Sequence, residues 1–357
     1  MAVKTAIVHD ALPFYGGAER TLAAMLEVLP GVPVFTLVHN RAALIGTPLE
    51  GVDIRSSFLD RLPGIHANHY RYFPLFPPAV RSFDLRGFDR VIASHYAVAN
   101  WARPAPGARF LSFMHTPLRY LWQQAGDRPA GLGSFLRRLA GPGRLLDRAA
   151  ARRVDAFAAN SRWIAGVVRR AYGRESAVVY PPVDVDRFSP AAQRDEVFIC
   201  VSRLAAHKRL ELVVATFNRI GLPLVVLGDG PERARLQMMA GTNIRFLGRL
   251  DDAAVAGWLG RARAFVHMAA EDFGIAVVEA QAAGCPVIAY AGGANRETVQ
   301  DGVTGVLVPE QTPESLAAGI ARFMREESRF EPELLRARAR RFDKSVFKEA
   351  FTKFTHS

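Results

Sequence analysis

Short apolar runs alternate with amphipathic segments through the first half of the chain. The apolar runs predict β-strands at residues 4–9, 32–37, 90–93, 109–113, 154–158 and 176–179. Between them, apolar residues recur at helical spacing and predict helices at 18–29, 118–125, 134–152 and 161–172. Because strands and helices alternate, we expect a mostly parallel sheet. The triplet Gly141-Pro142-Gly143 is expected to divide the third helix into two short ones.

The second half of the chain repeats this pattern. Apolar strand runs occur at 197–201, 224–227, 244–247, 264–268, 286–290 and 305–308, with helical segments between them. These elements predict a second doubly wound parallel sheet.

Prolines separate the two series of strands. In the stretch Tyr180-Pro181-Pro182-Val183-Asp184 the prolines exclude helix and interrupt any strand ladder. We therefore expect a first domain at residues 1–180, a linker at 181–192 and a second domain at 193–342. Apolar residues at helical spacing in the last segment, 343–357, predict a helix that packs back on the first domain.

Length and composition fit a globular protein with two cores. The chain has 357 residues, of which 50% are hydrophobic and 22% charged, and domains cluster at roughly 100–150 residues. No apolar run approaches the roughly 18–20 residues that cross a bilayer, and the first strand begins too close to Met1 for a secretory signal. The two cysteines, Cys200 and Cys285, lie in apolar strand contexts typical of buried thiols. We expect a cytoplasmic protein.

The positive charge is concentrated in the first half. The net charge is +12; residues 1–185 carry 23 Lys and Arg against 13 Asp and Glu, which is +10, and the rest carries +2. Anionic lipid head groups, a diphosphate-bearing substrate and nucleic acid are all acidic partners of this kind. The arginines are scattered and no nucleic-acid motif accompanies them, so we expect no nucleic-acid partner.

Two glutamates eight positions apart are the most informative feature. The stretch from Glu271 to Glu279 joins the strand run 264–268 to a helix that ends at Gly284. Ligands of open α/β sheets bind outside the carboxyl ends of the strands, so both glutamates and the first N–H groups of the helix are expected beside a ligand with hydroxyl groups and phosphate. The alternative is that Glu271 caps the loop and Glu279 is an ordinary helix carboxylate paired with an arginine.

Three other turns follow strands in the same way. Gly16 and Gly17 open the first helix, where backbone can approach an anion closely. Arg203 and Lys208 follow the first strand of the second series and suit phosphate oxygens, unless they are two solvated cations. Asp229, in Gly228-Asp229-Gly230-Pro231, suits a nucleobase or ribose, unless the segment is a simple turn.

Together, these motifs resemble those of the retaining glycosyltransferases of family 4, over essentially the whole chain. The resemblance rests on Gly16-Gly17-Ala18-Glu19, His115-Thr116-Pro117, Asn160-Ser161, Pro181-Pro182-Val183-Asp184, Arg203 with Lys208, and the pair Glu271 and Glu279. It implies the GT-B fold, in which two Rossmann-like doubly wound domains face a central cleft.

The resemblance also implies a role for each of these residues. Arg203 and Lys208 would hold the donor diphosphate, Glu271 the donor-sugar hydroxyls and Glu279 the ribose. Further contacts to the donor are implied for Gly16, Gly17, His115, Phe273, Gly274 and Ile275. It implies a front-side reaction without a protein base and without a metal. We expect Asp184 and Asp186, although spaced like a metal-binding D-x-D motif, to be structural.

The donor and acceptor are suggested by smaller stretches. The segments Val8-His9-Asp10 and His115–Trp122 are similar to those of bacterial mannosyltransferases that use GDP-mannose in surface-polysaccharide synthesis. Aromatic residues interleaved with arginines at 58–83, and leucines with arginines at 132–153, suit a lipid-diphosphate acceptor and peripheral attachment to the inner membrane leaflet. For 58–83 the alternative is an aromatic-rich core segment with a solvated arginine face.

Other function classes stay open. They are a family 4 transferase that uses a UDP-sugar, an epimerase or phosphorylase of the same fold, and a non-catalytic module that binds sugar nucleotides or lipid. Arg203, Lys208, Glu271 and Glu279 are all present, which favours the transferase.

Overall fold

The computed structural model describes residues 3–122 and 133–356, except for the side chains of Tyr120 and residues 133–140. The chain divides into two compact units. Unit 1 comprises residues 1–182 and 347–357, and unit 2 comprises residues 183–346. The domain boundary expected from the prolines was 180/181, and the boundary between the units falls after Pro182.

Unit 1 contains a seven-stranded parallel sheet. Its strands are β1 (Thr5–His9), β2 (Val34–Thr36), β3 (Ile54–Ser56), β4 (Arg90–His95), β5 (Arg109–Met114), β6 (Ala156–Ala159) and β7 (Ala177–Val178). Their order is β3-β2-β1-β4-β5-β6-β7, and all neighbours are parallel. The apolar pattern did not predict β3, because this short edge strand is half-buried to exposed and has no apolar run.

The helices of unit 1 lie between these strands, except for α13 (Lys344–His356), which is the last element of the chain. They are α1 (Gly17–Val28), α2 (Phe76–Arg81), α3 (Arg119–Trp122), α4 (Gly133–Ala151), α5 (Arg162–Tyr172) and α13, whose first three residues belong to unit 2. Three 3₁₀ segments (Phe58–Arg61, His69–Leu75 and Ala99–Trp101) lie in the loops that precede α2 or follow β4.

The prediction that Pro142 divides α4 is wrong, since α4 is one helix through Pro142. A proline inside a helix costs about 3 kcal/mol. Beyond it, the buried carboxylate of Asp147 accepts hydrogen bonds from Trp101 Nε1 (2.9 Å), Trp122 Nε1 (2.6 Å) and Tyr172 Oη (2.8 Å). Hydrogen bonds to a charged group stabilise by about 1.5–3 kcal/mol each, so this anchor offsets the cost of Pro142.

Unit 2 contains a six-stranded parallel sheet. Its strands are β8 (Phe198–Val201), β9 (Leu224–Leu227), β10 (Ile244–Gly248), β11 (Ala264–His267), β12 (Val287–Tyr290) and β13 (Gly305–Val308). The order is β10-β9-β8-β11-β12-β13, again with all neighbours parallel. The prediction of two doubly wound parallel sheets is confirmed.

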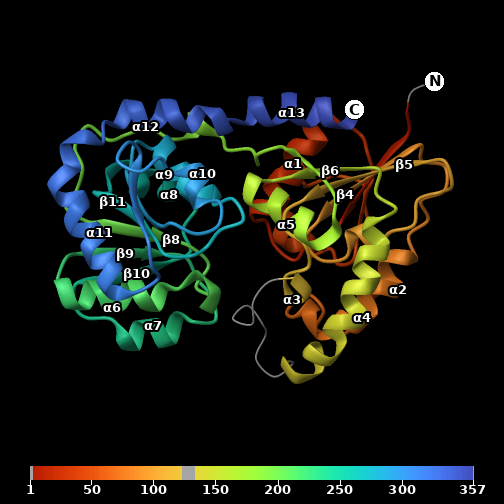
Figure 1. Cartoon of the computed structure of the whole chain (residues 1–357), viewed down its shortest axis with the longest axis horizontal. Helices are drawn as coiled ribbons and strands as arrows, with labels where there is room; N and C mark the ends of the chain where they lie inside the picture. Colours follow the sequence, from red (N-terminus) through yellow and green to blue (C-terminus); the bar gives the residue numbers. More distant parts are fainter. Residues whose placement is uncertain (1–2, 123–132, 357) are drawn as a thin grey trace. The chain divides into compact units, whose positions relative to one another are not determined.

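Helices cover both faces of this second sheet. They are α6 (Leu210–Ile220), α7 (Arg233–Met239), α8 (Asp252–Arg261), α9 (Ile275–Ala282), α10 (Asn295–Thr298), α11 (Pro313–Glu326) and α12 (Pro332–Ala339). In Figure 1, α6 and α7 lie on one side of the strands and α8, α9 and α10 on the other. Because all six strands are parallel, their carboxyl ends share one edge of the sheet.

The aromatic residues at 58–83 belong mainly to the core. Phe76 is buried, and Tyr70, Tyr72, Phe73 and Phe83 pack against the same hydrophobic cluster. Phe58 is the exception, with 46% of its surface exposed. The core alternative therefore describes this stretch, and its arginines (Arg61, Arg71 and Arg81) are exposed. The second stretch with a possible membrane role is 132–153. The part of it that lies outside the described residues comprises Leu132 and the side chains of Phe135, Leu136, Arg137, Arg138 and Leu139.

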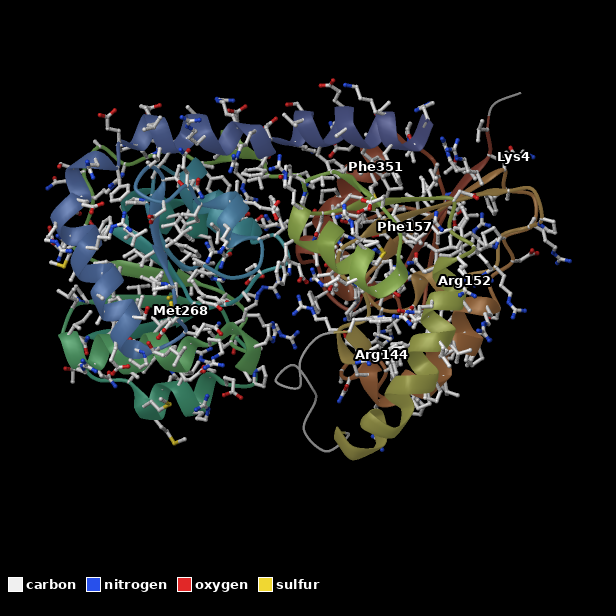
Figure 2. The ribbon with its side chains drawn as sticks, viewed as in Figure 1. Lys4, Arg144, Arg152, Phe157, Met268 and Phe351 are labelled. Carbon is white, nitrogen blue, oxygen red and sulfur yellow. The ribbon has the colours of Figure 1, made fainter. Side chains whose placement is uncertain are left out.

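Three phenylalanines of α13 belong to the core of unit 1. Phe347, Phe351 and Phe354 are buried in the cluster that contains Ile7 and Phe113. The Phe113 ring lies 6.1 Å from that of Phe347 and 6.4 Å from that of Phe351. Figure 2 labels Phe351 on the ribbon of α13. The C-terminal helix therefore contributes directly to the stability of unit 1.

Replacing Phe351 with alanine should destabilise unit 1 by about 3–5 kcal/mol, because a fully buried aromatic ring is lost and a cavity remains. The thermal unfolding midpoint of the full chain measures this loss. Val346→Ala is the matched control on the same helix, where the side chain is 44% exposed and little change is expected. Equal midpoints for the two variants would contradict the role assigned to α13.

Candidate functional site

Each sheet has one point at which its strand order reverses, and the polar residues of each unit gather there. In unit 1 this point lies between β1 and β4, and in unit 2 between β8 and β11. At such a point the loops diverge to opposite faces and leave a crevice at the carboxyl ends of the strands. The side chains that follow these strands are therefore the candidates for ligand binding in each unit.

In unit 2, Lys208 and Glu271 form a direct ion pair. Lys208 follows β8 and donates to Glu271 Oε1 at 2.6 Å, although the two residues are 63 positions apart. His267, the last residue of β11, places Nε2 at 2.9 Å from the same oxygen. All three side chains are largely withdrawn from solvent. The structure thus brings together two predicted site residues and adds a histidine that the sequence analysis did not single out.

This environment keeps Glu271 ionised. Burial by itself would raise the pKa of the carboxyl group, but the charge of Lys208 and the contact with His267 outweigh it and hold that pKa well below its usual range. Both contacts use Oε1, so within the described residues the lone pairs of Oε2 are directed to neither partner. A carboxylate of this kind can accept hydrogen bonds from hydroxyl groups at neutral pH.

Glycines shape the loop around Glu271. Gly274 has a φ of 87° and is the N-cap of α9, where a left-handed backbone favours glycine. Gly293 has a φ of 62°, and a Cβ there would lie 2.3 Å from the backbone oxygen of Glu271. That oxygen accepts a hydrogen bond from Ala294 N at 2.8 Å. The loops after β11 and β12 therefore lie against each other, which sets the position of Glu271.

The side chain of Phe273 packs beneath this loop. Its side chain is buried, and its ring lies 5.3 Å from that of Phe342. Ile275 begins α9, so its backbone N–H is one of the first of that helix. Such N–H groups have no partner within the helix and favour an anion. Phe273, Gly274 and Ile275 can therefore contribute backbone to a site, as the resemblance implies.

Arg203 and Asp229 lie on neighbouring loops after β8 and β9. Leu204 N donates to Asp229 O at 2.9 Å, and a Cβ at Gly228 would lie 1.9 Å from Ser202 O, so glycine is required for this close approach. Arg203 is exposed on the first loop. The Asp229 carboxylate accepts from Gly230 N at 2.7 Å and Arg233 Nη1 at 2.9 Å. These contacts, that of Gly230 first, lower its pKa against the opposing effect of desolvation. Arg233 thus already binds the side chain of Asp229.

Glu279 has an arginine partner. On the second turn of α9, its Oε1 lies 3.4 Å from Arg187 Nη2. Arg187 also binds Asp252 at 2.6 Å and lies over the ring of Phe188. The structure therefore contains the arginine partner that the alternative interpretation of Glu279 expected. Arg187 follows the proline segment and was not predicted as a site residue.

Asp184 and Asp186 lie in the same proline segment as Arg187. Asp186 accepts from Arg340 at 3.0 Å and lies 3.8 Å from Arg336. Asp184 precedes the 3₁₀ turn Val185–Arg187. Asp186 is therefore part of an arginine cluster.

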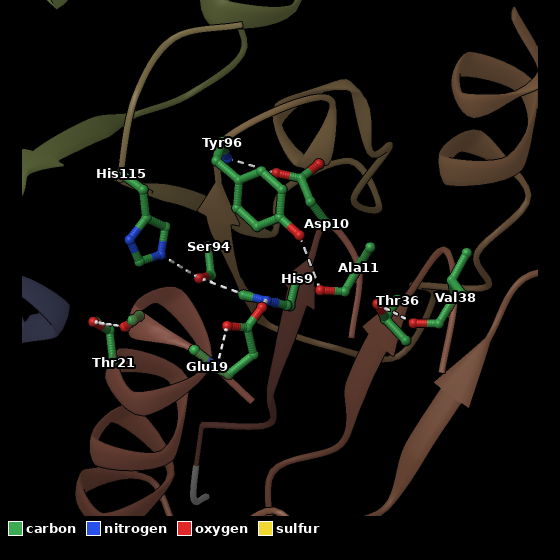
Figure 3. Close-up of polar contacts among 12 residues, drawn as sticks. His9, Asp10, Ala11, Glu19, Thr21, Thr36, Val38, Ser94, Tyr96 and His115 are labelled. Carbon is green, nitrogen blue, oxygen red and sulfur yellow. Dashed lines mark hydrogen bonds and ion pairs between the residues drawn. The ribbon is translucent and has the colours of Figure 1, made fainter. Parts of the chain in front are cut away.

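In unit 1, His115 belongs to a row of polar side chains that Figure 3 shows. Ser94 Oγ lies 2.9 Å from His115 Nε2 and 2.9 Å from His9 Nδ1. His9 Nε2 lies 3.7 Å from Glu19 Oε1, and Gly16 N donates to Glu19 Oε2 at 2.9 Å. Burial, with smaller contributions from His9 and His95, holds the pKa of His115 well below its usual range, so the ring is neutral at pH 7.

The two predicted glycines lie at the start of α1. Gly16 is its N-cap and Gly17 its first residue, which is exposed. A Cβ at Gly16 would lie 3.0 Å from the Phe14 ring and 3.1 Å from Glu19 Oε2. A Cβ at position 16 would therefore require the Phe14 ring and the Glu19 carboxylate to shift by a few tenths of an ångström.

Asp10 has a structural role. Its buried carboxylate accepts four backbone hydrogen bonds, from Tyr96 and Ala97 at 2.6 and 2.8 Å and from Val98 and Ala99 at 2.6 and 2.7 Å. These bonds account for both oxygens. Asp10 thus holds the loop after β4 against the end of β1.

Replacing Glu271 with glutamine tests the depressed pKa. A carboxyl group whose folded-state pKa lies below its unfolded value stabilises the fold above the unfolded pKa and loses that contribution as pH falls through the folded pKa. Below the ordinary value of 4.5, the wild type should therefore lose stability relative to Glu271→Gln. Unfolding midpoints between pH 7 and pH 3 measure this, with the exposed Glu333→Gln as control. Parallel pH profiles for wild type and Glu271→Gln would contradict the assignment.

The chain is similar in sequence to several bacterial sugar transferases. It is 31% identical over 167 residues to a phosphatidyl-myo-inositol mannosyltransferase of Mycobacterium tuberculosis, covering 42% of this chain and 44% of the relative. It is 35% identical over 162 residues to a GDP-mannose-dependent alpha-mannosyltransferase of Mycolicibacterium smegmatis, covering 42% and 43%. The chain thus spans less than half the length of these curated relatives.

Solved structures with the same fold cover the whole chain. HepE from Anabaena, in complex with UDP and glucose, has a TM-score of 0.74 at 18% identity and covers 100% of both chains. Sucrose-phosphate synthase from Thermosynechococcus elongatus has a TM-score of 0.76 at 19% identity and covers 98% of both. These similarities establish the GT-B fold.

Two family descriptions match consecutive parts of the sequence. "Glycosyltransferase Family 4" matches residues 15–187, and "Glycosyl transferases group 1" matches residues 183–342. The first match covers most of unit 1, including Gly16, Gly17 and His115, and the second covers the loops with Lys208 and Glu271. The chain therefore consists of a Glycosyltransferase Family 4 domain followed by a Glycosyl transferases group 1 domain.

Proposed function

We propose that the protein is a retaining glycosyltransferase that transfers a hexose, mannose from GDP-mannose, to a lipid-linked saccharide acceptor. The observation that carries this proposal is the ion pair between Lys208 and Glu271 at the switch point of the unit 2 sheet. It places a cation for phosphate and an anion for hydroxyl groups side by side. A sugar linked to a diphosphate presents both kinds of group.

Lys208 is suited to hold the donor diphosphate together with Arg203. An ammonium group has three N–H donors, and in the structure one of them is directed to Glu271 Oε1. The others can reach phosphate oxygens without breaking the ion pair. Arg203 adds the planar fork that phosphate favours. The first N–H groups of α9, at Gly274 and Ile275, complete a positive environment for the leaving group.

Glu271 is suited to the donor sugar and Glu279 to the ribose. Glu271 stays ionised and offers Oε2 to hydroxyl groups. Glu279 is bound to Arg187 and keeps limited exposure, so in this proposal it accepts from a ribose hydroxyl while the arginine holds it in place. Asp229, on the loop after β9, is suited to the nucleotide of the donor. In unit 1, the candidates for contact with a sugar nucleotide are Gly16, Gly17 and His115.

The chemistry follows from charge. The bond between the anomeric carbon and the phosphate oxygen breaks as the sugar becomes oxocarbenium-like, and negative charge collects on the departing diphosphate. The acceptor oxygen bonds to the anomeric carbon on the same face and passes its proton to a phosphate oxygen, so the stereochemistry is retained. Arg203 and Lys208 stabilise the leaving group, and we therefore expect no metal requirement.

The choice of donor rests on the relatives. A GDP-mannose-dependent mannosyltransferase is among them, which supports GDP-mannose. HepE, with the same fold, was solved with UDP-glucose, which supports the second candidate, a family 4 transferase for UDP-sugars. A protein that binds nucleotide sugars without transferring them is the third candidate.

A thermal-shift titration with GDP, GDP-mannose, UDP and UDP-glucose, with and without magnesium, separates these candidates. A ligand at 100 times its dissociation constant stabilises the native state by about 2.7 kcal/mol. We expect a guanine-selective shift that is independent of magnesium and is lost in Arg203→Ala. The control, Arg325→Ala, changes an exposed arginine of α11 and should keep the shift.

Transfer of labelled mannose to membrane lipid is the second readout. Lys208→Ala should lower the rate about 10²–10³-fold, the usual cost of removing one group that stabilises transition-state charge. Binding without transfer would favour the non-catalytic candidate. No shift with any nucleotide would overturn the donor site.

We also propose peripheral attachment to an anionic membrane surface through α4. Leu145 and Leu146 are 68% and 51% exposed on this helix, beside exposed arginines that include Arg152; Figure 2 labels Arg152 and Arg144. Arg144 and Arg148 also lie over the Trp122 ring, at 5.5 and 5.0 Å. Among the described residues, no helix is both long and apolar enough to span a bilayer. Exposed leucines next to cations suit an interfacial position.

Flotation with vesicles tests this attachment. The chain should float with vesicles that contain phosphatidylglycerol and less with purely phosphatidylcholine vesicles. The double variant Leu145→Ser, Leu146→Ser should lose flotation. Met238→Ser, which changes a residue of α7 that is 82% exposed, is the control and should float as the wild type does. Equal behaviour of the two variants would contradict a role for α4.

A further inference from the structure

Hydrogen bonds connect His115 to a row of buried side chains, and the geometry of the row indicates which atom donates in each of them. His9 is the last residue of β1, Ser94 is its register partner on β4, and His115 directly follows β5. Their polar atoms form the series Glu19, His9, Ser94 and His115, with both serine contacts at 2.9 Å (Figure 3). Because each member can donate or accept only in certain ways, the hydrogen positions can be derived one by one.

We propose that Glu19, His9 and Ser94 are positioning residues that hold His115 in the tautomer with hydrogen on Nε2, so that Nδ1 is the acceptor it offers. The role of His115 Nδ1 toward a ligand rests on the proposed function, in which this ring nitrogen accepts a hydrogen bond from a hydroxyl group of the donor sugar.

The derivation starts at Glu19, an acceptor without hydrogen when ionised. Its Oε1 lies 3.7 Å from His9 Nε2. A bare Nε2 would place two lone-pair acceptors opposite each other, whereas a hydrogen on Nε2 faces the anion. In this proposal His9 carries a single ring hydrogen, on Nε2, so its Nδ1 is the acceptor, and it lies 2.9 Å from Ser94 Oγ.

Ser94 transmits this choice to His115. A hydroxyl group has one hydrogen, and Ser94 uses it toward His9 Nδ1. Its oxygen can then only accept from His115 Nε2, which lies at 2.9 Å. His115 is neutral, so with hydrogen on Nε2 its Nδ1 has none. In Figure 3 the other ring nitrogen of His115 lies on the side away from Ser94.

The surroundings make this arrangement stable. His9 and Ser94 are fully buried, and Glu19 and His115 nearly so. The Tyr96 ring stands edge-on to His9 at 5.7 Å and to His115 at 6.3 Å, which limits access of water to the row. Electrostatic preferences are larger in such a low-dielectric interior than in water. A single tautomer is therefore favoured over a mixture.

The same row connects His115 to the loop that begins α1. Glu19 Oε2 accepts from Gly16 N at 2.9 Å while Oε1 faces His9. A Cβ at position 16 would lie 3.1 Å from this carboxylate oxygen, so the carboxylate would have to shift slightly. Glu19 thus links the loop that begins α1 to His115 through His9 and Ser94.

The experiment is a long-range ¹H–¹⁵N correlation spectrum of the full chain labelled at its nine histidines, recorded without nucleotide. The His115 signals are assigned by their loss in His115→Asn. We expect the wild-type ring to carry hydrogen on Nε2, and Ser94→Ala to convert it to a mixture of tautomers. Ser112→Ala removes another fully buried serine hydroxyl, on the neighbouring strand β5, and should leave the His115 signals unchanged.

A wild-type spectrum with hydrogen on Nδ1, or a Ser94→Ala spectrum like that of the wild type, overturns the proposal. If Ser94→Ala fails to fold, Glu19→Gln provides the same test, since it removes the charge that orients His9. Because no nucleotide is present, this result is independent of the proposed function. In a second arm, GDP-mannose but not GDP should shift His115 Nδ1; if both bind and neither shifts it, the role toward the sugar is overturned.

Discussion

The constraint on which the candidate sites depend is that all strands of each sheet run parallel. Parallel strands end at one edge, and at the point where the order reverses the following loops leave in opposite directions. In unit 2 this brings Lys208 after β8 next to Glu271 after β11. In unit 1 it aligns His9, Ser94 and His115 at the ends of β1, β4 and β5.

Buried carboxylates are used in two ways in this protein. Asp10 and Asp147 have their oxygens bonded to N–H and O–H donors of the chain, and both hold helices or loops in place. Glu271 is paired through one oxygen, and this pairing keeps it charged in a buried position. Since an unpaired buried charge is costly, the number of donors around a carboxylate separates structural groups from those that can bind a ligand.

Part of the candidate site could be predicted from sequence. Glycines and charged residues after apolar runs indicated the loops that contain Gly16, Lys208 and Glu271, because strand ends in parallel sheets are where ligands bind. The contacts of these residues could not be predicted. His267 was part of a strand pattern, and Arg187 part of a proline segment, until the fold placed them against Glu271 and Glu279. Partners distant in sequence leave no local signal.

The sequence by itself determined the order of the buried strands and the main helices, because apolar runs are buried and their period distinguishes strand from helix; the half-exposed edge strand β3 left no such signal. It also determined the two-sheet architecture, through the alternation of those elements. Only the tertiary structure decided that α4 continues through Pro142, that the aromatic residues at 58–83 lie mainly in the core, and which atoms face Glu19 and Ser94. These outcomes depend on packing and hydrogen bonds between residues that meet only after folding, and their free energies exceed local preferences.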